Sequence, residues 1–241
     1  MGNTTTSLPA LPAWVEWAES ITVILGVIIA IITLIIYLKE YIRHNREYAE
    51  SNKRLRAESA VRMAEMLAKE IVSDFCTLDC KWKVTERCSK LVEIISQKRS
   101  LNFDFAEVDE LPADVTASVD LFFAENKENE EFRTLVLGLL NKLEFISMNF
   151  VYNIAQADLV YQSMHQSFIL FMQTFYLAIA SLNKGIHTGP GKFYTCSIEL
   201  YNRWNAKRCD KIDSYNAELK KKQEAEAVAR RTGVTVGEPL K

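Results

Sequence analysis

The side chains that most often bind metals or act as nucleophiles are few in this sequence and scattered along it. Five cysteines occur, and Cys76, Cys80 and Cys88 have a spacing that one helix could bring together. A structural zinc site would need a further cysteine or histidine nearby, and the three histidines are widely separated. We therefore expect core or surface thiols in a reducing compartment, and no metal site.

Motifs of common enzyme classes are not found either. The sequence contains no HExxH, GxSxG or DxDxDG motif. No arginine lies four to seven positions before a histidine, so the Arg/His pair of small helical ribonucleases is missing. The glycine-rich loop 185–191 could offer backbone amides to a phosphate, but no Lys or Ser/Thr follows it in P-loop register. We predict a protein without catalytic residues and without a cofactor.

Two pairs of residues in the C-terminal half could form a polar pair or a small ligand site. Asn141 and Glu144 lie in one apolar helical pattern, and Arg203 and Trp204 lie in another. A polar group on a core-forming helix is normally buried together with a partner. We expect a structural pair, with Glu144 and Arg203 as one pairing, and keep a ligand pocket at the same residues as the alternative.

The composition predicts that helices position these residues. Only 8 Gly and 5 Pro occur among 241 residues, which disfavours folds that depend on many turns with positive φ. The formal net charge of −2 gives no general attraction to nucleic acid, so we expect no nucleic-acid partner. The predicted fold class is all-α.

A transmembrane helix is predicted near the N-terminus, over residues 20–38. Residues 21–38 carry no charge, and a helix of this length rises about 27 Å, close to the hydrocarbon thickness of a bilayer. Residues 1–19 would form a short external tail, with Trp14 and Trp17 at the outer membrane interface.

The flanking charges predict the orientation of this helix. No Lys or Arg precedes Lys39, whereas Lys39, Arg43 and Arg46 begin a basic juxtamembrane stalk over residues 39–59. The positive-inside rule then places the N-terminus outside and the C-terminal domain in the cytoplasm, with the chain anchored in the inner (cytoplasmic) membrane of the cell. A cleaved signal peptide is the competing interpretation, but the sequence lacks the basic n-region and small-residue cleavage site that it requires.

One face of the predicted span contains small or hydroxylated residues at steps of three and four: Thr22, Gly26, Ala30, Thr33 and Tyr37. The pair Gly26 and Ala30 lets two helix backbones approach closely in lipid. We predict self-association into a homo-oligomer through this face. A pore along the same face and a chance occurrence of small residues are the alternatives.

The rest of the chain is predicted to form a cytoplasmic helical bundle over residues 60–209. Apolar residues recur at helical spacing in segments of about 60–78, 81–97, 112–125, 130–154, 157–183 and 192–231. Inward positions include Val61, Ala64, Ile154 and Phe193. Segment 157–183 is interpreted as a buried core helix, because its apolar centre is too short for a second span. Residues 210–241 are expected to form a polar helical extension and a disordered tail.

A short motif, LLNKLE at residues 139–144, is followed by an aromatic segment up to Leu182 and by the stretch from Phe193-Tyr194 to Arg203-Trp204. In these features the chain resembles a bacterial and phage family of unknown function, whose members have one N-terminal membrane helix and a compact helical domain with a Leu-Asn-x-x-Glu core. The resemblance covers about residues 60–204. It implies an all-helical cytoplasmic domain and supplies no catalytic residues.

The predicted function is a membrane-anchored, non-enzymatic interaction protein. Its expected partners are the lipid bilayer, further copies of itself and a cytoplasmic protein. A sharper form is a membrane-perturbing effector of a bacterial anti-phage system, which rests on analogy. The alternative is a sensor whose cytoplasmic domain binds a small ligand or nucleotide near Glu144 and Arg203 and signals to the membrane helix.

Overall fold

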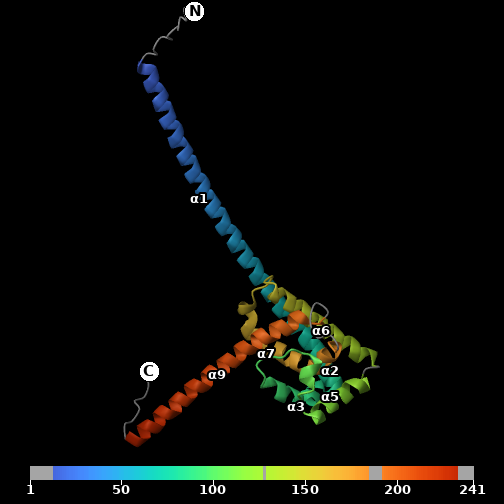
Figure 1. The fold of residues 1–241 in the computed structure, drawn as a ribbon. Coiled ribbons are helices and arrows are strands. Elements are labelled where there is room, and N and C mark those ends of the chain that lie inside the picture. The colour runs from blue at the N-terminus through green and yellow to red at the C-terminus, as the bar shows by residue number, and fades with distance from the viewer. Residues whose placement is uncertain (1–12, 127–128, 185–191, 233–241) are drawn as a thin grey trace, which may run out of the picture. The chain divides into compact units, whose positions relative to one another are not determined.

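The computed structural model describes residues 13–126, 129–184 and 192–232, with most side chains from Ile32 to Ala227 (Figure 1). Every element of secondary structure in these ranges is a helix, which confirms the predicted all-α fold class. The chain divides into two compact units, Met1–Arg54 and Leu55–Lys241. The division falls inside the predicted stalk, and each unit is described by itself.

Helix α1, Ala13–Met66, is uninterrupted and contains the whole of the predicted span and stalk. No proline occurs within it, so every residue can take part in the helical hydrogen-bond ladder. Some residues predicted to lie at the membrane interface or on the self-association face fall in the part of α1 whose side chains the structure does not describe. They are Trp14, Trp17, Thr22, Gly26 and Ala30. Of the predicted self-association face, Thr33 and Tyr37 are described, and Tyr37 is exposed.

The membrane helix predicted at residues 20–38 stays a prediction. Within the described residues, the helix that is long and apolar enough to cross a membrane is α6, Glu130–Val151. Eight residues of α6 are buried, and seven of them belong to the apolar core of the second unit. We therefore interpret α6 as a core helix.

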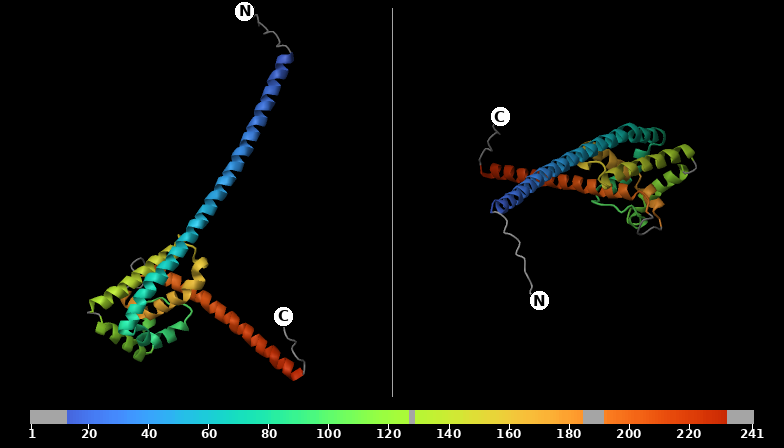
Figure 2. Two further views of the ribbon diagram at one scale, coloured as in Figure 1. Left: turned by 180° about the vertical axis from the view of Figure 1, so that it is seen from behind. Right: turned by 90° about the horizontal axis from the view of Figure 1, so that it is seen from above.

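Most helices of the second unit lie together (Figure 2), and their buried side chains form one apolar core. After α1 come the π-helical turn η1 (Leu67–Ile71), α2 (Val72–Trp82), α3 (Val84–Ser96), α4 (Phe105–Val108), α5 (Ala113–Asn126), α6, α7 (Ala157–Thr174), α8 (Tyr176–Leu182) and α9 (Thr195–Thr232). Helix α6 packs against α9, and α7 packs against both α3 and α9. The core is rich in fully buried aromatic side chains, among them Tyr161, Tyr176, Tyr201, Phe103 and Phe168.

Two predicted helices are divided differently in the structure. Lys83 has a left-handed backbone (φ 52) that separates α2 from α3, so the helix predicted at 81–97 begins at Val84. The helix predicted at 157–183 is broken at Phe175 (φ −95, ψ 15) into α7 and α8. In contrast, α6 begins at Glu130 as predicted, because the Asn129 side chain accepts a 3.1 Å hydrogen bond from the Phe132 amide and caps the helix.

The π-helical turn η1 explains one error in the predicted inward face. Ala60 and Met63 are buried, whereas the predicted Val61 is 50% exposed; the predicted Ala64 is partly buried and does pack against the core. A π turn holds one residue more than an α turn, so the positions before it are displaced by one. Two further inward predictions, Ile154 and Phe193, are also wrong, since both side chains are exposed. These two residues lie just outside α6 and α9, where the helical period no longer applies.

Candidate functional site

Glu144 on α6 binds the first turn of α9. Its carboxylate accepts hydrogen bonds from the backbone amides of Cys196 and Ser197, at 3.1 and 2.8 Å. The start of a helix leaves such amides without intrahelical partners and favours a negative charge. One turn earlier on α6, Asn141 accepts a 3.4 Å hydrogen bond from the Tyr194 hydroxyl. Asn141 and Glu144 therefore join α6 to the start of α9.

The predicted pairing of Glu144 with Arg203 is not found in the described structure. Arg203 pairs with Glu199 on the same helix, and both side chains are about half exposed. The acceptor atoms of Glu144 are occupied at the start of α9, and Arg203 lies roughly 10 Å further along that helix. The structure therefore does not pair Glu144 with Arg203, and the ligand site near these residues stays a prediction.

Trp204, the fourth residue of the predicted site, lies in the core. Its ring is within 5.2–5.8 Å of the rings of Phe150, Tyr161 and Phe168, measured between centroids. Edge-on and tilted aromatic pairs of this kind stabilise a core beyond the burial of their area. Trp204 thus packs α9 against α6 and α7.

The two buried thiols, Cys88 and Cys196, lie in surroundings that disfavour the thiolate. Burial raises the pKa of the Cys196 thiol, and the charge of the Glu144 carboxylate raises it further. Burial also raises the pKa of Cys88 to about 12. A nucleophilic cysteine needs a lowered pKa and access to solvent. Cys76 and Cys80 are exposed, and all five thiols are free. Within the described ranges, no three His, Cys, Asp or Glu side chains are grouped so as to hold a metal ion.

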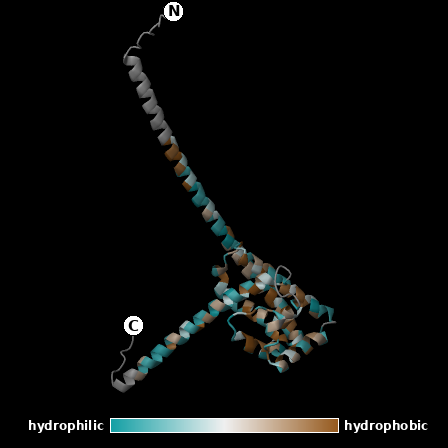
Figure 3. Cartoon of the chain, viewed as in Figure 1, coloured by the Kyte–Doolittle hydropathy of each residue, from teal (hydrophilic) through white to brown (hydrophobic). Residues whose placement is uncertain are grey.

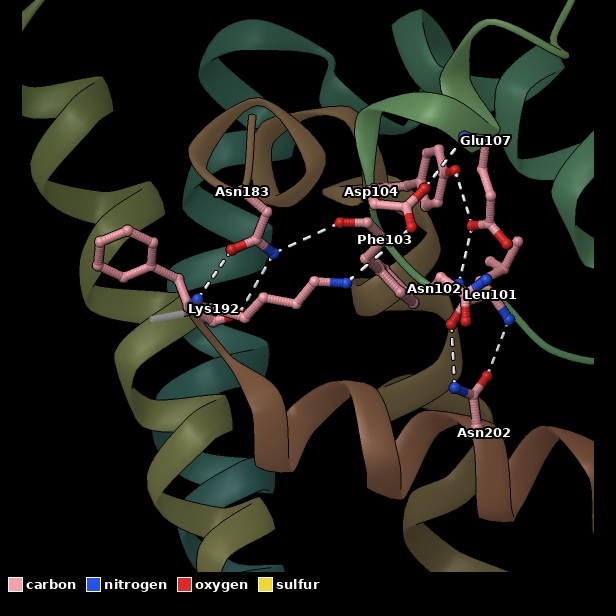
Figure 4. Close-up of polar contacts among 10 residues, drawn as sticks. Leu101, Asn102, Phe103, Asp104, Glu107, Asn183, Lys192 and Asn202 are labelled. Carbon is pink, nitrogen blue, oxygen red and sulfur yellow. Dashed lines mark hydrogen bonds and ion pairs between the residues drawn. The ribbon is translucent and has the colours of Figure 1, made fainter. Parts of the chain in front are cut away.

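Two asparagines hold the connection between α3 and α4 in place (Figure 4). The Asn202 side chain both accepts from the Leu101 amide and donates to the Leu101 carbonyl, each at 2.9 Å. Asn183 donates to the carbonyls of Phe103 and Phe193, each at 3.4 Å, and accepts from the Phe193 amide at 2.8 Å. These side chains replace the backbone partners that an irregular segment lacks. Phe103 can therefore adopt φ 51 with its side chain fully buried.

A third asparagine acts on the same connection. Asn205 is 0% exposed and donates to the carbonyls of Lys98 and Arg99, at 2.9 and 3.0 Å. Its own carbonyl oxygen accepts from Arg208 at 3.1 Å. None of these asparagines is among the residues predicted from the sequence, although Asn202 and Asn205 stand among apolar positions of α9, which is the pattern of a buried polar group with a partner.

Two carboxylates complete this polar cluster. Asp104 accepts from the Glu107 amide at 3.1 Å and lies 4.0 Å from the Lys192 ammonium. Glu107 accepts from the Asn102 amide at 2.8 Å and from the Tyr176 hydroxyl at 3.2 Å. Burial and the neighbouring Glu107 raise the pKa of Tyr176 well above its ordinary value. Each carboxylate is thus bonded to the protein's own amides and hydroxyls, which fits a structural role.

An apolar groove of about 380 Å³ opens between α5, α6 and α8. Its walls include Phe123, Phe132, Val136, Leu140 and Leu177, and its polar lining residues are Asp120, Arg133 and Ser181. No histidine or cysteine lies among the lining residues. The groove has room for an apolar group.

In the first unit, the part of α1 whose side chains are described begins at Ile32 with a run of apolar residues, coloured brown in Figure 3. Ile32, Leu34, Ile35, Ile36 and Leu38 are between 51% and 65% exposed. The basic residues Lys39, Arg43 and Arg46 follow on the same helix. A continuous apolar surface of this kind is unfavourable in water and marks a surface that is normally covered.

The chain was compared with protein-family models, with characterised proteins and with solved structures, and none of them matches it. The resemblance of residues 60–204 to a bacterial and phage family therefore stays a prediction.

Proposed function

We propose that this protein is a single-pass membrane-anchored interaction protein without enzymatic activity, and that it self-associates through its membrane helix. The observation that carries the proposal is the apolar surface of α1. Each large aliphatic residue described between Ile32 and Leu38 is exposed by half or more, and residues 21–31 continue the uncharged sequence. Lipid would cover this surface, with a gain of about 25 cal/mol for each Å² removed from water.

The charges beside the apolar segment support one orientation. The basic residues begin at Lys39, directly after Leu38, and none precedes it. This asymmetry favours an external N-terminus and a cytoplasmic C-terminal unit in the inner membrane. The non-enzymatic part of the proposal is supported by the polar groups of the second unit, since Glu144, Asp104 and Glu107 are bonded within the fold.

Labelling of native cysteines tests the anchor and its orientation. Cys76 and Cys80 are exposed, so a membrane-impermeant maleimide should label them in inverted inner-membrane vesicles and not in intact cells. A cysteine introduced by Asn3→Cys should show the reverse pattern. The chain should also stay with the membrane after alkaline carbonate extraction. Release into the soluble fraction would falsify the proposed anchor.

Substitutions in the span test self-association. The full-length variant Gly26→Leu/Ala30→Leu should lose the oligomer measured by mass in detergent or nanodiscs, because leucine side chains keep the backbones apart. Val27→Leu/Ile31→Leu is a matched control on the remaining surface of the same turns and should leave the mass unchanged. An identical oligomer in both variants contradicts association through the predicted face.

A further inference from the structure

In the first part of the predicted stalk, residues 39–54, the charged and the uncharged residues lie on different faces of the helix. Eight of these sixteen residues are charged: Lys39, Glu40, Arg43, Arg46, Glu47, Glu50, Lys53 and Arg54. Helix α1 is continuous through this segment, and at about 100° per residue all eight fall within an arc of about 140°. Opposite them lies an uncharged face, an arc of about 120° formed by Tyr41, His44, Asn45, Tyr48, Ser51 and Asn52, and the two other uncharged residues, Ile42 and Ala49, lie between this arc and the charged one.

The uncharged face is open in the structure. Tyr41 is 59% exposed and Tyr48 is 65% exposed. A tyrosine near the end of a span can lie in the membrane interface, but Tyr48 lies ten residues after Leu38, which is about 15 Å along the helix. The membrane interface therefore does not account for Tyr48. On the charged side, Arg43 and Glu47 pair with each other at 3.6 Å, so that side has partners within the helix.

We infer that the uncharged face is a helix–helix interface with a second copy of this chain in parallel orientation. Its members repeat at seven residues, since Tyr48 follows Tyr41, Ser51 follows His44 and Asn52 follows Asn45. This spacing keeps one seam facing a partner helix. The asparagines and hydroxyls make the face too polar for lipid, and they can bond to their equivalents across a seam.

The charges favour a copy of the same chain as the partner. The inference rests on the proposed function, in which a common membrane anchor aligns the copies in parallel. In a parallel pair of identical helices each residue meets its own equivalent, so charges on the seam would repel each other. All eight charges of residues 39–54 lie away from the uncharged face. A seam of tyrosines and asparagines meets no such repulsion.

Photo-cross-linking in the full-length protein tests the inference. Benzoylphenylalanine is placed in native membranes at Tyr41 or Tyr48 on the uncharged face, or at Arg46 or Lys53 on the charged side as matched controls. We expect several-fold more adduct with the mass of a homodimer from Tyr41 and Tyr48 than from the controls. Equal yields at the four positions, or adducts with a different protein alone, would overturn the inference.

A charge exchange gives a second readout that a folding defect cannot imitate. With the cross-linker at Tyr48, Asn52→Asp should lose most of the homodimer adduct, and Asn52→Lys should lose it as well. Co-expression of the two variants should restore the adduct, because opposite charges then meet across the seam. If the mixture cross-links no better than either variant alone, the two copies do not meet at Asn52 and the inference is wrong.

The outcomes separate this inference from the proposed function. If the full-length chain stays in the membrane as an oligomer but Tyr41 and Tyr48 cross-link no better than Arg46 and Lys53, the interface in the stalk is wrong and the anchor stands. If the chain is released by carbonate extraction, the proposed function is wrong, and the parallel pairing that depends on it is wrong as well.

Discussion

Glu144 and Ser197 are joined twice, since one carboxylate oxygen accepts from both the backbone amide of Ser197, at 2.8 Å, and its hydroxyl, at 2.7 Å. The two residues lie 53 positions apart in the sequence. Ser197 is buried, so its hydroxyl and amide depend on this carboxylate for their partners. The contact places the start of α9 against the middle of α6.

Neutralising this carboxylate should destabilise the second unit. Glu144→Gln keeps the shape but removes the negative charge at the start of α9, so we expect a loss of about 1–2 kcal/mol in the free energy of unfolding. Urea denaturation measures the change. The control Glu199→Gln removes the negative charge that pairs with the half-exposed Arg203 and should cost under about 1 kcal/mol. Equal losses in both variants would contradict the role of Glu144.

Replacing Asn205 by aspartate should have a larger effect. The carboxylate cannot donate to the Lys98 and Arg99 carbonyls that Asn205 now binds, and it would place a charge at a fully buried position. We expect a loss of at least about 3 kcal/mol in the free energy of unfolding. Asn216→Asp, at an exposed position of α9, should change it by less than about 0.5 kcal/mol. A thermal melt in which both variants match the wild type would refute the interpretation.

Thr174 offers a stabilising substitution. Its hydroxyl is buried and has no hydrogen-bond partner in the described part of the chain. Thr174→Val replaces that hydroxyl by a methyl group of similar size, so we expect a gain of about 1 kcal/mol in the free energy of unfolding. Ser147→Ala is the contrasting change, because the Ser147 hydroxyl donates to the Leu143 carbonyl at 2.7 Å. A lower melting temperature for Thr174→Val would show that the hydroxyl does have a partner.

Alkaline pH should destabilise the fold through Cys88. Burial raises the pKa of this thiol to about 12, whereas an unfolded cysteine ionises near 8.5. The buried Cys88 thiol therefore contributes its full share of the folding stability below about pH 8.5. This share is lost as the pH rises toward 12, by about 1.4 kcal/mol per pH unit. Tyr201, whose pKa burial raises to about 12, acts in the same direction above about pH 10.

Urea midpoints of the wild type and of Cys88→Val at about pH 8 and about pH 10 test this linkage. The midpoint of the wild type should fall more steeply than that of the variant, which has no thiol to ionise at this position. In the same pH range, exposed Cys76 and Cys80 should be alkylated before Cys88. Parallel pH profiles for the two proteins would rule out Cys88 as the group responsible.

Helical periodicity predicted most of the helices of the second unit but not their breaks. The segments expected at 112–125 and 130–154 agree closely with α5 and α6. The break at Phe175 has no local signal, since no Gly or Pro lies near it. Phe175 is fully buried, and its ring lies edge-on to that of Phe75 at 6.2 Å. Contacts between distant segments therefore decide this backbone geometry, and a single sequence pattern does not contain them.

The partner of Glu144 could not be predicted from the sequence either, because it too depends on contacts between distant segments. The sequence indicated that Glu144 needed a partner, because it interrupts an apolar helical face. Its partner depends on where α9 begins, and α9 begins at Thr195 rather than at the predicted 192. The left-handed backbone of Tyr194 (φ 60) precedes this start. That geometry directs two amides of the first turn, and not Arg203, toward the carboxylate.

The asparagine contacts to the connection between α3 and α4 have a consequence for folding kinetics. Asn202 and Asn205 bind carbonyls more than 100 residues earlier in the chain, and Asn183 binds one 80 residues earlier. Such contacts form only after the helices that carry them have docked. The Leu101 amide should therefore gain protection from hydrogen exchange later in refolding than the amides within α6. Substitutions at Asn202 should accelerate unfolding while leaving the refolding rate nearly unchanged.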